Sequence, residues 1–147
     1  MQQILILGGG AAGLAAALAA AQTAEGRAHI TVLDKNAKAG KKLLATGNGR
    51  CNLSNLHGTS GGYHGENPGF ADYALGKFPP TAALEWFRSL GLLTVAEDSG
   101  RVYPYSDQAN SVVDVLRFAL EKLNITVKLG FEAEKVKKAA SGFRIIS

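Results

Sequence analysis

The sequence lacks the features that mark several large classes of protein. It has one cysteine, Cys51, so it cannot form an internal disulfide. Its four prolines accompany no G-X-Y repeat, which excludes collagen-like and proline-rich linker sequences. The longest strongly apolar stretch, residues 14–21, is too short for a membrane span, and the N-terminus shows no basic segment or signal-peptide cleavage pattern. The sequence therefore predicts a cytoplasmic protein without membrane association.

Positive charge and glycine are concentrated in a few segments. The formal net charge is +4, but residues 35–50 contain five basic residues and no acidic one, while the remaining sequence has 11 basic and 12 acidic residues. Of the 18 glycines, four lie in residues 8–13 and eight in residues 40–69. A local basic patch suggests a local anionic partner. The uneven placement of glycine is the main feature that a functional interpretation has to explain.

Hydrophobic patterning predicts an α/β fold that begins with a βαβ unit. Residues 4–7 are an apolar run typical of a buried parallel strand, residues 14–21 have a strongly helix-forming composition, and residues 29–33 predict a second strand. Periodicity is lost from residue 35 to about residue 73, which predicts a long glycine-rich loop. The later elements that we expect are helices at 81–90 and about 108–123, with Ser106 or Asp107 as a cap, a third strand at 125–129, and β-hairpins at 92–105 and 131–146.

The first glycine cluster matches a dinucleotide-binding motif. Gly8-x-Gly10-x-x-Gly13 follows a predicted strand and opens a predicted helix, and Asp34 ends the next strand. In such a motif Gly8 makes the tight turn, Gly10 lets the backbone approach a pyrophosphate, and Gly13 permits close helix packing. Asp34 would accept hydrogen bonds from a ribose 2′-OH. The alternative is a turn without a ligand, in which Asp34 is an ordinary turn residue. The motif predicts an ADP-containing dinucleotide but does not distinguish FAD from NAD.

A second glycine cluster lies in the basic segment. Residues 40–52 combine glycines at 47 and 49, which permit unusual backbone conformations, with the cations Lys41, Lys42 and Arg50. The cations could reach the same anionic ligand as the first cluster. A solvated basic surface loop is the alternative interpretation, since charged surface loops are common.

The sequence resembles a group of bacterial FAD-binding flavoproteins, the aminoacetone-oxidase-family or BaiN-like NAD(P)/FAD-dependent oxidoreductases. The resemblance covers nearly the whole chain, and its most specific part is Gly49-Arg50-Cys51-Asn52. This family commonly has Glu at the position of Asp34 and a third glycine at the position of Asn48. Asp can still serve the ribose, and Asn tolerates a left-handed backbone better than most residues. The matching segments are Gly8–Gly13, Asp34-Lys35, Gly40–Leu44, Gly47–Asn52, Gly100–Pro104 and Ala109–Asp114.

The resemblance implies FAD contacts from several parts of the chain. The first glycine cluster would hold the pyrophosphate, the end of the second strand would border the adenosine ribose, and the second glycine cluster would approach the ribityl phosphate and the isoalloxazine. A cation near flavin N1 and C2=O would stabilise the anion formed on reduction, and Arg50 is a candidate for that cation. In chain order, the implied cofactor-binding residues are Gly8, Gly10, Ala11, Ala12, Gly13, Asp34, Lys35, Lys41, Lys42, Gly49, Arg50, Cys51, Asn52 and Val136, the last through its backbone against adenine.

Other chemistries find less support in the sequence. Without a second cysteine, Cys51 cannot perform dithiol chemistry, and a buried packing role is favoured over a reactive thiolate beside Arg50. The three histidines lack metal-ligand spacing, so we assign no metal. Residues 35–50 contain no aromatic residue between their cations, which argues against nucleic-acid binding.

The predicted fold class is therefore a Rossmann-like FAD/NAD(P)-binding α/β domain with a C-terminal β-hairpin that begins a β-meander. We expect residues 1–147 to be the N-terminal part of a longer, truncated FAD/NAD(P)-binding domain, with residues 35–80 as a glycine-rich cofactor-loop insertion. The parent protein would be an FAD-dependent oxidoreductase that transfers hydride between NADH or NADPH and a small organic substrate. The chain alone would be inactive, and its edge at residues 143–146 could self-associate. The alternative is a dinucleotide-binding module without redox chemistry.

Overall fold

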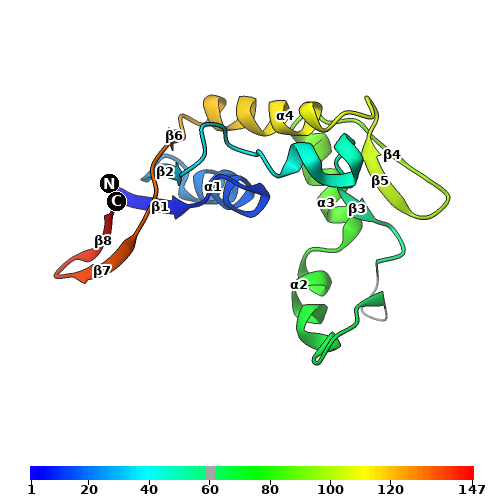
Figure 1. Cartoon of the computed structure of the whole chain (residues 1–147), viewed down its shortest axis with the longest axis horizontal. Coiled ribbons are helices and arrows are strands. Elements are labelled where there is room, and N and C mark those ends of the chain that lie inside the picture. The colour runs from blue at the N-terminus through cyan, green and yellow to red at the C-terminus, as the bar shows by residue number, and fades with distance from the viewer. Residues whose placement is uncertain (59–61) are drawn as a thin grey trace. The chain divides into compact units, whose positions relative to one another are not determined.

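The computed structural model describes residues 1–58 and 62–147, and these divide into two compact units. The first unit contains residues 1–43 and 116–147, and the second contains residues 44–115. We describe each unit by itself, with the element labels of Figure 1.

A parallel three-stranded sheet forms the centre of the first unit. Its strands are β1 (Gln2–Leu7), β2 (Ala28–Asp34) and β6 (Thr126–Leu129), in the order β1-β2-β6. Strand β2 is central, so it pairs on both sides: Leu33 is opposite Leu7 in β1 and Lys128 in β6. The sheet confirms the βαβ unit and the third strand that the sequence predicts.

Helix α1 (Ala11–Ala24) connects β1 to β2 and packs on the sheet, as Figure 1 shows. Its alanine-rich sequence lets it approach the sheet closely, and its buried residues are Leu14, Ala17 and Leu18. The C-terminal part of α4 (Ala109–Lys122) adds Leu116 and Leu120 to the buried residues of the first unit. Full burial of one such leucine side chain contributes about 1.5–3 kcal/mol, so these buried residues stabilise the first unit.

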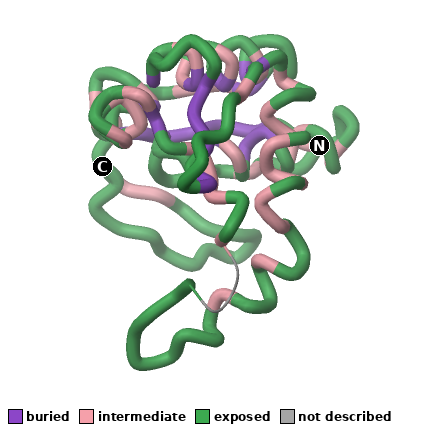
Figure 2. Tube along the Cα trace, turned by 90° about the vertical axis from the view of Figure 1, so that its right-hand side faces the viewer, coloured by how far each residue is buried: buried purple, intermediate pink, exposed green. Residues whose placement is uncertain are grey.

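The chain ends in an antiparallel hairpin formed by β7 (Lys135–Ala139) and β8 (Gly142–Ile146). Figure 2 shows the hairpin as exposed, with intermediate burial only near the end of β8. The predicted strand from residue 131 begins four residues late. The reason is that Gly130 N and Phe131 N donate to Asn36 O and Asp34 O, at 3.2 and 2.9 Å, so the chain first follows the end of β2. Phe143 is 71% exposed, and the expected self-association stays a prediction.

The second unit contains an antiparallel sheet in the order β3-β5-β4. Strands β4 (Thr94–Ala96) and β5 (Arg101–Pro104) form the predicted hairpin, and β3 (Ser54–Asn55) adds a third strand that the sequence did not indicate. Helix α3 (Pro80–Ser89) agrees with the predicted helix within one residue. The core of this unit includes Cys51, Leu92, Val102, Tyr103 and Val112.

The segment predicted as one long loop contains short elements. These are η1, two 3-10 turns separated by a kink within Leu43–Gly49, η3 (Pro68–Ala71) and α2 (Asp72–Lys77). Elements of two to seven residues are too short to show a hydrophobic period, so the sequence could not reveal them. Residues 59–61 of the predicted insertion lie outside the described residues.

Among the described residues, no helix has the length and apolar character needed to cross a membrane.

Gly13, in the first turn of α1, lies very close to the backbone of Gly8. A Cβ placed on Gly13 would lie 1.8 Å from Gly8 O and 3.0 Å from Gly8 C, which are backbone atoms that cannot turn aside. We expect Gly13→Ala to lower the free energy of unfolding by at least about 1–3 kcal/mol, the usual cost of overpacking. Urea denaturation followed by far-UV circular dichroism measures this change. As a control, Gly76→Ala in α2 places its Cβ in open space and should leave stability equal or slightly higher, because Ala favours a helix.

Candidate cofactor-binding site

The turn between β1 and α1 leaves room for a ligand. Gly8, with φ +98°, directly follows β1 and donates through its N–H to Leu33 O at 2.8 Å, which ties the turn to β2. Gly10 directly precedes α1, and a Cβ placed there would meet no atom within 4 Å. No side chain in the described part of the chain caps this helix end. The first N–H groups of α1, those of Ala11, Ala12 and Gly13, therefore form a helix N-terminus suited to an anion.

Asp34 lies at the carboxyl end of β2 and is 7% exposed. Its Oδ2 accepts a hydrogen bond from Gly9 N at 2.5 Å, and its Oδ1 accepts bonds from Asn36 N at 2.7 Å and Asn36 Nδ2 at 2.8 Å. Burial alone would raise the pKa of Asp34, but the bonds from Asn36 and Gly9 and the charge of Lys35 together hold that pKa below its usual value. The carboxylate is therefore ionised at neutral pH.

The same bonds limit what Asp34 can offer a ribose. An ionised carboxylate has about four lone-pair sites, and the Gly9 and Asn36 bonds occupy three of them. About one site is left for a ribose hydroxyl. Gly9 and Asn36 were not among the predicted site residues. Only their positions could have indicated them, because Gly9 directly follows the first glycine of the motif and Asn36 lies two residues after Asp34.

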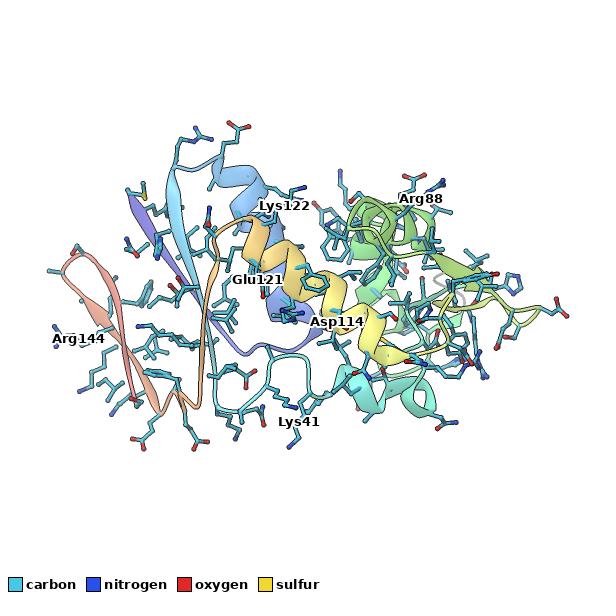
Figure 3. The ribbon with its side chains drawn as sticks, turned by 90° about the horizontal axis from the view of Figure 1, so that it is seen from above. Lys41, Arg88, Asp114, Glu121, Lys122 and Arg144 are labelled. Atoms are coloured by element: carbon cyan, nitrogen blue, oxygen red, sulfur yellow. The ribbon has the colours of Figure 1, made fainter. Side chains whose placement is uncertain are left out.

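The basic residues after β2 have different environments. Lys35 Nζ donates to Glu132 Oε1 at 3.1 Å in an exposed ion pair, a partner that the sequence did not indicate. Lys41 and Lys42 are exposed, and Figure 3 shows the Lys41 side chain pointing away from the ribbon. Gly40 N donates to Gly9 O at 2.7 Å, so the start of the second glycine cluster is bonded to the glycine turn. Lys41 and Lys42 therefore directly follow a residue, Gly40, that is hydrogen-bonded to that turn.

In the second unit, residues 46–52 form a loop with a mostly left-handed backbone, which we call the Gly-Arg-Cys loop. Positive φ values occur at Gly47 (+55°), Asn48 (+56°), Gly49 (+85°) and Cys51 (+61°). Asn48 thus adopts the conformation that the sequence predicted it would tolerate. Two backbone bonds close the loop, from Arg50 N to Gly47 O (3.1 Å) and from Cys51 N to Thr46 O (3.0 Å).

The interior of the Gly-Arg-Cys loop is tightly packed. A Cβ on Gly47 would lie 2.7 Å from Asn52 N and 3.2 Å from Tyr103 Cε1, so only glycine fits. With its amide nitrogen assigned to the side that faces two carbonyl oxygens, Asn52 donates to Ser54 O at 2.9 Å and Val102 O at 3.3 Å. Asn52 therefore joins the loop to β3 and β5.

Cys51 and Arg50 differ in exposure. Cys51 is 2% exposed, which agrees with the packing role favoured from the sequence. The Arg50 side chain is 34% exposed and contacts Glu97, Asp107 and Tyr103. None of these three was a predicted site residue; Asp107 was only a candidate cap. The last predicted cofactor residue, Val136, lies in β7 of the first unit, opposite Ile145, and is 52% exposed.

Together, the parallel sheet, the glycine turn at a helix N-terminus and the buried carboxylate at the end of β2 define a Rossmann-type dinucleotide-binding fold. The family model described as the HI0933-like protein Rossmann domain matches residues 2–147. The chain belongs to this family, and the resemblance to BaiN-like FAD-dependent oxidoreductases drawn from the sequence is confirmed.

Curated relatives match nearly the whole chain. The 3-dehydro-bile acid delta(4,6)-reductase of Clostridium scindens is 45% identical over 145 residues, which are 99% of this chain and 35% of the relative. The ribosomal RNA dihydrouridine synthase of Escherichia coli is 33% identical over 141 residues, 96% of this chain and 34% of the relative. The chain thus spans about a third of the length of these relatives.

Solved structures support the fold. Thermovibrio ammonificans THI4 matches 98% of this chain and 45% of its own, with a TM-score of 0.62 and 16% identity. The open conformation of a flavocytochrome c3 fumarate reductase matches 98% of this chain and 31% of its own, with a TM-score of 0.60 and 20% identity. At these identities the likeness concerns the fold alone.

The lowered pKa of Asp34 makes a pH-dependent contribution to stability. We expect Asp34→Asn to lower the free energy of unfolding by about 1–3 kcal/mol at neutral pH, because it removes the charge from three hydrogen bonds. The difference from wild type should be complete above about pH 4, the ordinary Asp value, and should shrink as pH falls through the lowered pKa of the folded state.

Urea titrations between pH 2 and pH 7 measure this difference. Asp98→Asn, in an exposed turn, is the matched control and should show little difference at any pH. A difference for Asp34→Asn that stays constant down to pH 2 would contradict the role given to the ionised carboxylate.

Proposed function

We propose that the chain is the FAD-binding part of an oxidoreductase that passes hydride from NADH or NADPH through FAD to a small organic substrate. The observation that carries the proposal is the open turn at Gly10, placed between the N-terminus of α1 and the Asp34 carboxylate. Membership of a flavin-dependent oxidoreductase family supports FAD over NAD as the bound dinucleotide.

The residues of the first unit fit the ADP part of FAD. The space at Gly10 admits a pyrophosphate, which Gly8, Ala11, Ala12 and Gly13 would surround with backbone N–H groups and the positive end of the helix dipole. Asp34 would accept one hydrogen bond from the ribose, and a 2′-phosphate would be repelled by its charge. In this proposal Lys35 borders the ribose, Lys41 and Lys42 follow the ribityl phosphate, and the Val136 backbone contacts adenine.

The Gly-Arg-Cys loop of the second unit is the proposed flavin-contacting segment. Its left-handed residues turn the backbone in ways that a regular helix or strand does not, and Gly49 lacks a side chain that would cover it. FAD would supply the redox chemistry by accepting hydride and passing it on. Gly49, Arg50 and Asn52 would form the protein surface beside the flavin, and the buried Cys51 would lie directly beneath it.

The names of the relatives guide the proposal on substrate. One is named as a 3-dehydro-bile acid delta(4,6)-reductase and the other as a ribosomal RNA dihydrouridine synthase. We favour a small organic substrate over RNA because the bile-acid relative is 45% identical and the RNA-modifying one 33%. The absence of aromatic residues between the cations of residues 35–50 supports the same choice.

FAD binding is tested by substitution in the space that the pyrophosphate would use. Gly10→Val adds a side chain where the structure has no neighbour, so the fold should be retained while the affinity for FAD falls at least about tenfold. The purified protein is mixed with FAD, and retained flavin is measured by its visible absorption. Ala19→Val, at an exposed position farther along α1, is the control and should bind like wild type. A full-length parent protein that is purified colourless and takes up no added FAD would overturn the proposal.

Hydride transfer requires a second measurement. The full-length parent protein, loaded with FAD, should lose its visible flavin absorption when mixed anaerobically with NADH or NADPH. Retention of the colour with both donors would instead favour a dinucleotide-binding module without redox chemistry.

A further inference from the structure

The contacts of Arg50 suggest a role different from that of a cation facing the flavin. Its Nη2 donates to Glu97 Oε1 at 2.8 Å, its Nε donates to Asp107 Oδ1, and its guanidinium carbon lies 3.8 Å from the centroid of the Tyr103 ring. We call Arg50, Glu97, Asp107 and Tyr103 the arginine clamp. All four residues belong to the second unit.

The clamp joins the Gly-Arg-Cys loop to three other parts of this unit. Glu97 follows β4, Tyr103 lies in β5, and Asp107 lies in the turn before α4. Tyr103 is 5% exposed, so the guanidinium lies against a ring fixed in the core. A planar guanidinium can bridge two carboxylates and stack on a ring at the same time, which a lysine ammonium cannot do.

The charge of the clamp argues against a cationic site. Asp107 first, and then Glu97, hold the pKa of Arg50 above its usual value by accepting its hydrogen bonds, so Arg50 remains protonated. One positive charge faces two carboxylates, and the group has a formal charge of −1. Such a group offers little positive potential to an anionic reduced flavin.

The backbone around the clamp needs support. Asn48, Cys51 and Asp107 have positive φ values of +56°, +61° and +58° without being glycine. Such conformations cost free energy and persist only where the surroundings determine them. Arg50 lies between Gly49 and Cys51 in sequence and bonds to Asp107, so its side chain connects both left-handed regions.

We propose that Arg50 is a positioning residue: its contacts with Glu97, Asp107 and Tyr103 hold the Gly-Arg-Cys loop in shape, and the loop backbone, not the guanidinium charge, meets the flavin. The contact between the loop backbone and the flavin rests on the proposed function. The support that Arg50 gives to the loop concerns the protein alone and can be tested without FAD.

The test compares Arg50→Gln, Arg50→Lys, the double variant Glu97→Ala/Asp107→Ala, and the triple variant that combines the Ala pair with Arg50→Gln. Arg88→Gln on α3 is the matched control, because Arg88 is an exposed arginine of the same unit outside the clamp (Figure 3). FAD affinity and the visible spectrum of bound flavin are measured for each variant. Amide hydrogen exchange of Arg50 and Cys51 is measured without FAD.

A positioning role predicts that Arg50→Gln and the Ala pair weaken FAD binding alike, by about tenfold, and that the triple variant is no worse than either. Arg50→Lys should not restore affinity or the wild-type flavin spectrum. The amides of Arg50 and Cys51, which close the loop, should exchange about tenfold faster in all four variants and unchanged in the control.

A cationic role for Arg50 predicts a different pattern. The Ala pair would free the guanidinium and bind FAD as well as wild type or better, and Arg50→Lys would restore affinity. Either result would overturn the proposal. If the wild-type protein binds no FAD, the proposed function fails, but hydrogen exchange still decides whether Arg50 holds the loop. Unchanged amide exchange in Arg50→Gln would overturn the positioning role of Arg50.

Discussion

The hydrogen bond from Gly9 N to the buried Asp34 carboxylate joins the two segments that carry the candidate site. It connects the turn after β1 to the end of β2 and so fixes the start of α1 relative to the central strand. Gly13 allows this arrangement, because the helix approaches the Gly8 carbonyl more closely than any side chain would permit. Gly10 directly follows Gly9 in this turn, and a Cβ placed on it would meet no atom within 4 Å.

The general fold followed from the sequence because its signals are long or local. The apolar run at residues 4–7, the alanine helix and Gly8-x-Gly10-x-x-Gly13 indicated the βαβ unit, and the structure contains it. Strand β3 has two residues and pairs with β5 across nearly fifty positions, so no period could reveal it. The late start of β7 has a similar cause, because residues 130 and 131 bond to residues beside β2 that are distant in sequence.

Features of the candidate site that depend on backbone conformation could be predicted from the sequence. Features that depend on which side chains come into contact were harder to predict. The residue type of Asn48 indicated that it tolerates a left-handed backbone, which it adopts, and the residue type of Cys51 favoured the buried place that it occupies. The environment of Arg50 could not be deduced, because Glu97 and Asp107 carry no motif and are brought to it by the β4–β5 hairpin and the turn before α4. A basic segment in a sequence therefore shows that cations are present but not which groups they face. Acidic residues elsewhere in the chain can pair with them and neutralise their charge.

The position of β6 beside β2 has a consequence for how the first unit is assembled. Residues 35–125 separate these paired strands, and they include the whole second unit. The entropy lost on closing a segment grows with its length, and contacts between distant residues slow folding. A second unit that has already folded fixes the separation of residues 44 and 115, which shortens the flexible part of the segment. Prior folding of the inserted unit would therefore lower the entropy cost of pairing β6 with β2.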